Sequence, residues 1–377
     1  MCGGTTQTIL VVVPGLGRGG TETHLARTLP GLRREGFDVR LFSLRGGEMA
    51  AEFAAAGVPV NAPGRFWPLN LLRLAWLLFT ARPALVHFYL PMAYVLGAPL
   101  ALLAGRRCAM SRRSLNDYQR AHPLAAWVER RLHRRMAALT GNAQAVMRQL
   151  AEEGAPAARL RLIYNGIALP EPPTPEARAE KRRELGLTPG SVAFVIAANL
   201  IPYKGHADLV AACGLLAAGT DAEWTVLLAG RDSEGIRAGL EHQAADLGIA
   251  ERLRFLGGRS DMGEILAACD AGILCSHEEG FSNAVLEGMA AGLPMLVTDV
   301  GGNAEAVENG VCGLVAPPHD PEALAAGMAA LLDADARARL GAAARARAAE
   351  RFGLSACIAA HARLYADMHI ETAGGAP

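Results

Sequence analysis

Two glutamates and the backbone amides between them could bind a ligand that has hydroxyl groups at its ends and phosphate in its middle. Glu279 and Glu287 have seven residues between them in the stretch SHEEGFSNAVLEGMAAGLPMLVTDVGGNAE, residues 276–305. We expect a helix to open at this turn, with Glu279 at its start, so that both carboxylates lean toward one face. The first amides of a helix are free donors at the positive end of its dipole, which suits a diphosphate. Here those amides belong to Phe281, Ser282 and Asn283.

Apolar runs on both sides predict that this stretch is part of a strand–helix–strand unit. Strands are expected at 271–275 and 295–298, and Gly292 ends the helix between them. Ligands bind at such strand-to-helix turns in open α/β sheets. A nucleotide sugar has the required chemistry, although both acids could instead only favour a helix start and a solvated face.

The stretch resembles the signature of the retaining glycosyltransferases of GT-B fold known as group 1 or family four. Their two glutamates separated by seven residues, followed by M-A-x-G-x-P and a glycine-rich turn, are matched at nearly every position. The resemblance implies that Glu279 contacts hydroxyls of the donor sugar and Glu287 contacts the ribose. It also implies that Gly280, the amides of 281–283 and the turn containing Gly302 complete the donor site.

A lysine at another strand-to-helix turn could meet the donor phosphates. Lys204 follows the strand expected at 192–198, near a helix start. A surface lysine is the simpler interpretation, but proteins with this signature place a phosphate-binding Lys-Gly here. They usually add an arginine a few residues earlier, where this chain has Asn199. Both Lys204 and Asn199 are therefore donor-site candidates, and Arg231 is the candidate to replace the missing arginine.

The first strand, expected at 8–13, is followed by a glycine-rich turn that allows two interpretations. Gly15, Gly17 and Gly20 form G-x-G-x-x-G, which alone predicts dinucleotide binding in an oxidoreductase. The second strand, however, ends without the acid that this motif requires. The resemblance instead implies that the backbone of Gly20 lies beside the donor phosphate, where a side chain would prevent close approach. His24, four residues on, is expected to pack within the helix.

The acceptor side departs from the family pattern. Many relatives have a catalytic-region histidine after the strand expected at 107–110, but residues 110–116 contain none. His87, expected at the end of its strand, and Arg113 are the candidates to act beside Glu279 and Lys204, although His87 could equally be a satisfied strand-end residue. A histidine is not required, since a donor phosphate oxygen can take the acceptor's proton in a retaining, front-face reaction.

Alternating strands and helices in both halves predict two Rossmann-like domains, each with a doubly wound parallel sheet. The resemblance implies a GT-B fold in which these α/β domains face each other across a cleft. We predict an acceptor domain at 1–167, a proline-rich extended linker at 168–178 and a donor domain at 179–352. A final helix at 353–370 would cross back to the first domain.

Charge is distributed unevenly. Residues 1–165 contain 21 arginines, no lysine and nine acids, so their balance is +12 and that of the remainder is −12. This asymmetry suggests an anionic partner, either nucleic acid or an acidic membrane, or only an arginine-rich surface. A basic helix expected at 121–137, near the apolar stretch 66–79, could lie on an anionic bilayer or face solvent. The arginines concerned are Arg106, Arg107, Arg112, Arg113, Arg120, Arg130, Arg131, Arg134 and Arg135.

Other classes of protein fit the sequence poorly. Seven cysteines without a C-x-x-C pair predict reduced thiols rather than a disulfide frame or zinc site. Residues 84–105 are uncharged and long enough to span a bilayer, but Pro91 predicts a strand and then a helix. The N-terminus has no basic region ahead of its apolar run, so we expect no secretory signal. Asp333-Ala334-Asp335 resembles a metal-binding triplet but falls between helices; we expect no metal and no cofactor.

Together these observations predict a retaining glycosyltransferase that transfers a sugar from a nucleotide diphosphate, with UDP favoured over GDP, to an acceptor hydroxyl. The expected acceptor is a cell-envelope polysaccharide, a lipopolysaccharide or a lipid-linked oligosaccharide, and nucleic acid is not an expected partner. We expect a cytoplasmic location, with peripheral attachment to the inner face of an anionic membrane left open. The alternatives are a non-hydrolysing nucleotide-sugar epimerase, which shares the fold, and an inactive nucleotide- or NAD-binding module.

Overall fold

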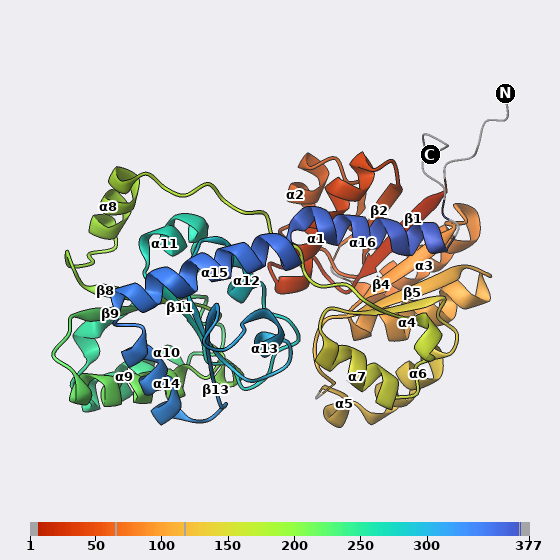
Figure 1. The fold of residues 1–377 in the computed structure, drawn as a ribbon. Helices are drawn as coiled ribbons and strands as arrows, with labels where there is room; N and C mark the ends of the chain where they lie inside the picture. The colour runs from red at the N-terminus through yellow and green to blue at the C-terminus, as the bar shows by residue number, and fades with distance from the viewer. Residues whose placement is uncertain (1–6, 65, 117, 369, 371–377) are drawn as a thin grey trace. The chain divides into compact units, whose positions relative to one another are not determined.

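A computed structural model describes residues 7–64, 66–116, 118–368 and 370, without the side chain of Arg120. The expected absence of a secretory signal falls largely outside these residues. The chain forms two compact units (Figure 1). Unit 1 consists of residues 1–166 and 354–377, and unit 2 consists of residues 167–353.

The sheet of unit 1 is parallel and has the strand order β3-β2-β1-β4-β5-β6-β7. The chain moves outward from β1 in one direction and, from β4, in the other, so the β1–β4 boundary is a topological switch point. Its strands are β1 (Thr8–Val13), β2 (Asp38–Ser43), β3 (Val60–Asn61), β4 (Leu85–Tyr89), β5 (Arg107–Arg112), β6 (Ala138–Gly141) and β7 (Leu160–Leu162).

Helices cover this sheet because buried apolar residues recur at helical spacing between the strands. On one side α3, α4 and α6 pack next to one another, and elsewhere α16 packs along α1 (Figure 1). A side-chain carbon on Gly31 would lie 2.2 Å from Ile358, so α1 and α16 approach closely because Gly31 is glycine. The helices are α1 (Gly20–Arg34), α2 (Ala50–Ala55), α3 (Trp67–Thr80), α4 (Pro91–Leu103), α5 (Tyr118–Ala121), α6 (Pro123–His133), α7 (Gln144–Glu152) and α16 (Leu354–Asp367).

Unit 2 repeats the design with a parallel sheet of order β10-β9-β8-β11-β12-β13, whose switch point lies between β8 and β11. Its strands are β8 (Val192–Ala197), β9 (Trp224–Ala229), β10 (Leu253–Gly257), β11 (Ala271–Leu274), β12 (Met295–Thr298) and β13 (Gly313–Ala316). Its helices are α8 (Pro175–Glu184), α9 (His206–Gly219), α10 (Arg237–Asp246), α11 (Met262–Ala268), α12 (Asn283–Ala290), α13 (Asn303–Ala306), α14 (Pro321–Ala330) and α15 (Ala334–Phe352). Both units are therefore doubly wound α/β structures, as predicted.

Two predicted segments differ from the structure. The expected extended linker at 168–178 runs into α8, which begins at Pro175, because proline suits the first position of a helix. The Thr174 side chain caps this helix by accepting a hydrogen bond from the Ala177 amide. The helix expected at 121–137 is instead two helices, α5 and α6, separated at His122 and followed by β6.

The uncharged segment 84–105 forms β4 and α4, as the proline predicted, and no helix in the described ranges is long and apolar enough to cross a membrane. Leu90, at the β4–α4 turn, has a φ of 69°, in the left-handed region. The six described cysteines are buried free thiols.

The prediction that Arg112 belongs to the basic surface of the first half is wrong. The side chain of Arg112 is fully buried and donates hydrogen bonds to Glu129 and, at 2.7 Å, to both carboxylate oxygens of Glu153. Burial of the guanidinium is compensated by these two carboxylates, since an unpaired buried charge would be costly. Arg112 is thus paired inside unit 1 and is not available to a partner.

We predict that Asp333 is a helix cap and not a metal ligand. Its carboxylate accepts a hydrogen bond of 2.7 Å from the Ala336 amide at the start of α15. Asp333→Ala should lower the free energy of unfolding by about 1 kcal/mol, whereas Asp333→Asn keeps an acceptor oxygen and should stay within a few tenths. Urea unfolding measures both, and equal losses in the two variants would contradict the capping role.

Candidate functional site

Four of the candidate residues in unit 2 lie on loops at the carboxyl edge of its sheet. β8 and β11 are neighbours at the switch point, and the loops that follow them bear Lys204 and Glu279. The loop after β9 bears Arg231, and the turn after β12 bears Gly302. In open α/β sheets this is the place where ligands bind.

An ion pair connects the first two loops. The Lys204 ammonium lies 2.5 Å from Oε1 of Glu279, and both side chains are mostly buried, with 17% and 11% of their surface exposed. The Ser276 hydroxyl donates a hydrogen bond of 2.8 Å to the same oxygen. The lysine nitrogen also lies 5.1 Å from the centre of the Tyr203 ring, within reach of a cation–π contact. A cation and a carboxylate are therefore fixed side by side at the switch point.

Backbone contacts hold the same loops together. The His277 amide donates a hydrogen bond of 2.7 Å to the Tyr203 carbonyl. Gly205 has a φ of +71°, and a side-chain carbon there would lie 2.0 Å from the Cys275 carbonyl oxygen. This close approach of the two loops therefore requires glycine at position 205 for two reasons, its left-handed backbone conformation and its lack of a side chain.

The glycine turn after β12 supports Glu279 from another side. The Gly302 amide donates a hydrogen bond of 2.8 Å to the Gly280 carbonyl. Gly301 has a φ of +55°, and a side-chain carbon on it would lie 1.8 Å from the Glu279 carbonyl oxygen. Gly280 and Gly302 therefore act through the backbone, as part of the frame around the carboxylate.

The expected helical relation between the two glutamates is wrong. α12 begins only at Asn283, with Ser282 as its extended N-cap, so Glu279 lies in the preceding loop. Glu287 lies on α12 and is half-buried. Ser282 and Asn283 do supply amides at the helix N-terminus, as predicted. Phe281 precedes the helix, and its buried ring lies 5.3 Å from the ring of Phe352.

Asn199 and Arg231 meet at the ends of β8 and β9. The Asn199 side-chain oxygen accepts a hydrogen bond of 3.1 Å from the Arg231 amide, and both residues are exposed. A side-chain carbon on Gly230 would lie 1.9 Å from the Ala198 carbonyl, so these loops are also in close backbone contact. The loops that bear Asn199 and Arg231 are therefore neighbours at the carboxyl edge of the sheet.

In unit 1, Gly20 begins α1 at the carboxyl edge beside the switch point. Gly15 and Gly17 have no positive φ, so their conformations are not restricted to glycine. The half-buried Arg113, just after β5, donates a hydrogen bond of 2.6 Å to Asn165. Burial raises the pKa of Glu22, against smaller opposing effects of its own backbone amide and of Arg113. Arg113 and Glu22 thus lie near one another at this edge.

His87 is not placed for acceptor chemistry. It lies in the middle of β4, fully buried, with hydrogen bonds of 3.0 Å to Tyr365 and 2.9 Å to Ser111. Burial lowers its pKa well below the usual range, with further effects of His361 and Arg113. Both ring nitrogens are occupied, which favours the satisfied strand residue over the catalytic candidate.

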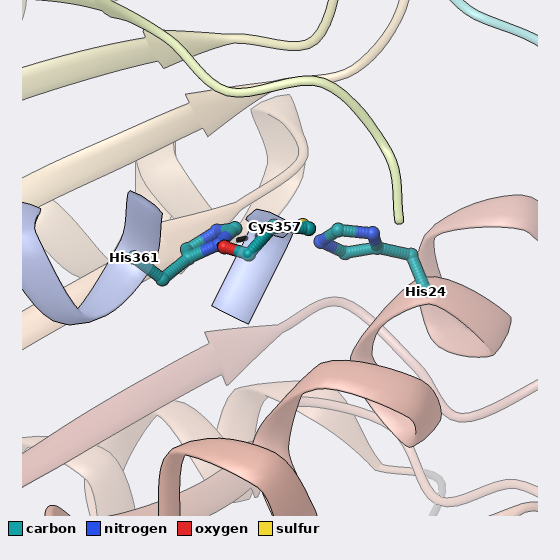
Figure 2. Close-up of side chains that lie close together, drawn as sticks. All are labelled: His24, Cys357 and His361. Atoms are coloured by element: carbon teal, nitrogen blue, oxygen red, sulfur yellow. Dashed lines mark hydrogen bonds between the residues drawn. The ribbon is translucent and has the colours of Figure 1, made fainter. Parts of the chain in front are cut away.

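His24 lies on α1 and packs against α16, as expected for a helix-packing residue. It lies beside Cys357 and His361 of α16 (Figure 2). Its two ring nitrogens have no hydrogen-bond partner among the described residues. Burial lowers the pKa of His24, and it lowers the pKa of His361 to about 4. Burial therefore disfavours the protonated form of both imidazoles.

Among the residues that the structure describes, the fold brings together three groups of potential metal ligands that sequence spacing did not reveal. They are His24, Cys357 and His361; Asp208, His277 and His319; and Glu129, His133 and Glu153. In the second group, Nε2 of His277 lies 2.7 Å from Asp208, next to the Lys204 loop. Other residues that sequence reasoning missed are Ser276 and Tyr203. Ser276 could have been noticed, since it is a polar residue soon after a strand.

Solved structures support the fold. HepE from Anabaena, solved with UDP and with UDP-glucose, aligns with a TM-score of 0.86 at 22% identity, covering 96% of this chain and 99–100% of HepE. Sucrose-phosphate synthase from Thermosynechococcus elongatus aligns with a TM-score of 0.82 at 18% identity, covering 96% of this chain and 99% of the synthase. With its two parallel-sheet units, the protein has the GT-B fold.

Sequence comparison gives the family. Residues 18–170 match the model "Glycosyltransferase Family 4" and residues 177–347 match "Glycosyl transferases group 1". A D-inositol 3-phosphate glycosyltransferase from Nocardia farcinica is 30% identical over 372 residues, covering 89% of this chain and 82% of the relative. The chain therefore belongs to the group 1, or family four, glycosyltransferases.

Other relatives match over shorter segments. The enzyme of the same name from Corynebacterium glutamicum is 31% identical over 191 residues, and that from Thermobispora bispora is 32% identical over 222 residues. These matches cover 48% and 56% of this chain and only 46% and 51% of the relatives, about half of their length.

The tight turn at Gly301 provides a test of the frame around Glu279. Gly301→Ala should destabilise unit 2 by about 1–2 kcal/mol for the left-handed backbone and by about 1–3 kcal/mol more for the clash with the Glu279 carbonyl. Gly292 is the matched control, since it has a φ of +87° but no described atom within 4 Å of where a side-chain carbon would lie. Urea unfolding should show the larger loss for Gly301→Ala than for Gly292→Ala, and similar losses would contradict the packing argument.

Proposed function

We propose that the protein transfers a sugar from a nucleotide diphosphate, preferably UDP, to an acceptor hydroxyl with retention of the anomeric configuration. The observation that carries the proposal is the fixed Lys204–Glu279 pair beside the N-terminus of α12. The lysine and the helix amides suit phosphates, and the carboxylate suits sugar hydroxyls. The UDP bound to HepE supports UDP as the base and phosphate part of the donor.

In the proposed reaction, the bond between the sugar's anomeric carbon and the donor phosphate oxygen breaks. The acceptor oxygen forms a new bond to that carbon on the same face, and its proton passes to the departing phosphate oxygen. Lys204 and the amides of Ser282 and Asn283 would stabilise the negative charge that develops on the leaving diphosphate. Glu279 would orient the sugar, and Glu287 would bind the ribose.

The contacts expected for Gly20, Gly280, Phe281, Asn199, Arg231 and Gly302 remain part of this proposal. With His87 buried, Arg113 is the remaining acceptor-side candidate, and it sits at the carboxyl edge of unit 1. For the acceptor we propose a polysaccharide, lipopolysaccharide or lipid-linked glycan of the cell envelope. An acceptor screen should include D-inositol 3-phosphate, which is named for the Nocardia relative.

The activity is tested by incubating the protein with UDP-sugars with and without acceptors. Retaining transfer predicts an acceptor-dependent product with the donor's anomeric configuration, read by NMR. An epimerase would interconvert the donor without acceptor, and a binding module would turn over nothing. Either of those results would overturn the proposal.

Replacing Lys204 should weaken catalysis. We expect Lys204→Ala to slow transfer by roughly 10- to 150-fold, since a charged hydrogen bond is worth about 1.5–3 kcal/mol. Lys181→Ala is the control, because Lys181 lies on α8 and not on the loops of the proposed site. This lysine also forms ion pairs, with Glu184, Asp261 and Glu264. Its loss should affect stability and not transfer; an unchanged rate in Lys204→Ala would remove Lys204 from the site.

Replacing Glu279 should separate turnover from nucleotide binding. Glu279→Ala removes the contact to the sugar, so we expect lower turnover and a nearly unchanged dissociation constant for free UDP, measured by calorimetry. Glu279→Gln, which keeps an acceptor oxygen, should retain more activity. If Glu279→Ala abolishes UDP binding, the carboxylates have been assigned to the wrong ends of the donor.

A further inference from the structure

One helix of unit 1 presents large apolar side chains to solvent. On α3, Leu72 and Trp76 are each 68% exposed and Phe79 is 56% exposed. They recur at three- and four-residue spacing on the side opposite Asn70, Leu74 and Leu78, which are buried. Arg73 is the only charged residue of α3. A helix this apolar is expected to be buried on all sides, so we expect a partner to cover its exposed face.

The neighbouring helices extend this apolar surface. α4 packs beside α3, since Gly97 leaves room for Leu74, and α4 has no charged residue. It ends at Leu103, which is 78% exposed. α6 packs on the other side of α4, where the Tyr94 hydroxyl donates a hydrogen bond of 3.2 Å to the Glu129 carbonyl. α6 exposes Leu124 and Trp127.

Arginines gather at the end of the same helices. In a parallel α/β unit the C-termini of the helices lie at the amino edge of the sheet, where cations are favourable. The turns there, before β5 and β6, form a hollow of about 460 Å³ lined by Arg106, Arg107, Arg135 and Arg159, and the described lining contains no acid. Arg134 and Arg131 are exposed nearby, and Arg131 lies over the Trp127 ring. Glu129 and Glu153 cannot neutralise this group because they are buried with Arg112.

We propose that this surface, formed by α3, α4, α6 and the arginine-lined hollow, docks on an anionic lipid bilayer. Trp76, Phe79 and Leu103 enter the interfacial region, and the arginines bind lipid phosphates. A symmetric dimer through the same surface would bring two arginine-rich, acid-poor patches together, which is unfavourable. The arginine-lined hollow lies at the amino edge of the sheet, at the opposite end from Gly20 and Arg113. The inference does not depend on the proposed transferase activity.

The test is co-sedimentation of the full chain with vesicles of phosphatidylcholine, alone or mixed with phosphatidylglycerol. We expect binding to the mixed vesicles, weakened by salt. Arg134→Gln with Arg135→Gln should lower the partition coefficient roughly 25-fold, at about fivefold per arginine. Trp76→Ser with Phe79→Ser should lower it at least about tenfold, because two large apolar groups stay in water.

Matched controls lie on unit 2. Leu215→Ser removes an apolar side chain that is 45% exposed, and Arg351→Gln removes an exposed arginine; neither should change vesicle binding. Circular dichroism of each variant confirms that it is folded. Equal binding to both kinds of vesicle, no binding to the mixed vesicles, or equal effects of control and surface variants would each overturn the proposal. A concentration-dependent dimer abolished by Trp76→Ser would overturn it in favour of a second copy.

Discussion

The ion pair between Lys204 and Glu279 is the contact around which the proposed donor site is built. It joins the loops that follow β8 and β11, which leave the sheet in opposite directions at the switch point. Two unlike charges held this close, and mostly out of water, need no large rearrangement to meet a diphosphate on one side and a sugar on the other. Ser276 fixes the carboxylate further, so its position does not depend on the lysine alone.

Glycine makes that pair possible. The loop that bears Glu279 passes so close to Gly205 and Gly301 that a side chain at either position would clash with its backbone. Both glycines also have left-handed backbones. The glycine-rich turn after β12 therefore has a structural role, because it supports the backbone of Glu279 and Gly280. In unit 1, by contrast, Gly15 and Gly17 have no such requirement, which weakens the dinucleotide interpretation of their spacing.

The sequence revealed the alternation of elements and the motif residues, because both are local patterns. It did not reveal that Lys204 touches Glu279, since they are 75 positions apart and meet only through the order of the strands. The predicted start of α12 is too early because the backbone remains extended as far as Ser282, past the turn at Gly280. The two interpretations of His87 stay open in the sequence because one of its two partners, Tyr365, is 278 positions away on α16. Contacts between distant residues, which periodicity does not encode, decide the first and the last of these cases.

The most direct test of the donor site is a thermal shift of the whole chain with UDP, GDP, ADP and NAD in separate samples, repeated with Lys204→Ala. We expect UDP to stabilise the wild type by about 2.7 kcal/mol at 100 times its dissociation constant, with a smaller shift in the variant at the same concentration. Stabilisation by NAD alone, or by UDP equally in both proteins, would contradict the assignment of the nucleotide diphosphate to the Lys204–Glu279 site.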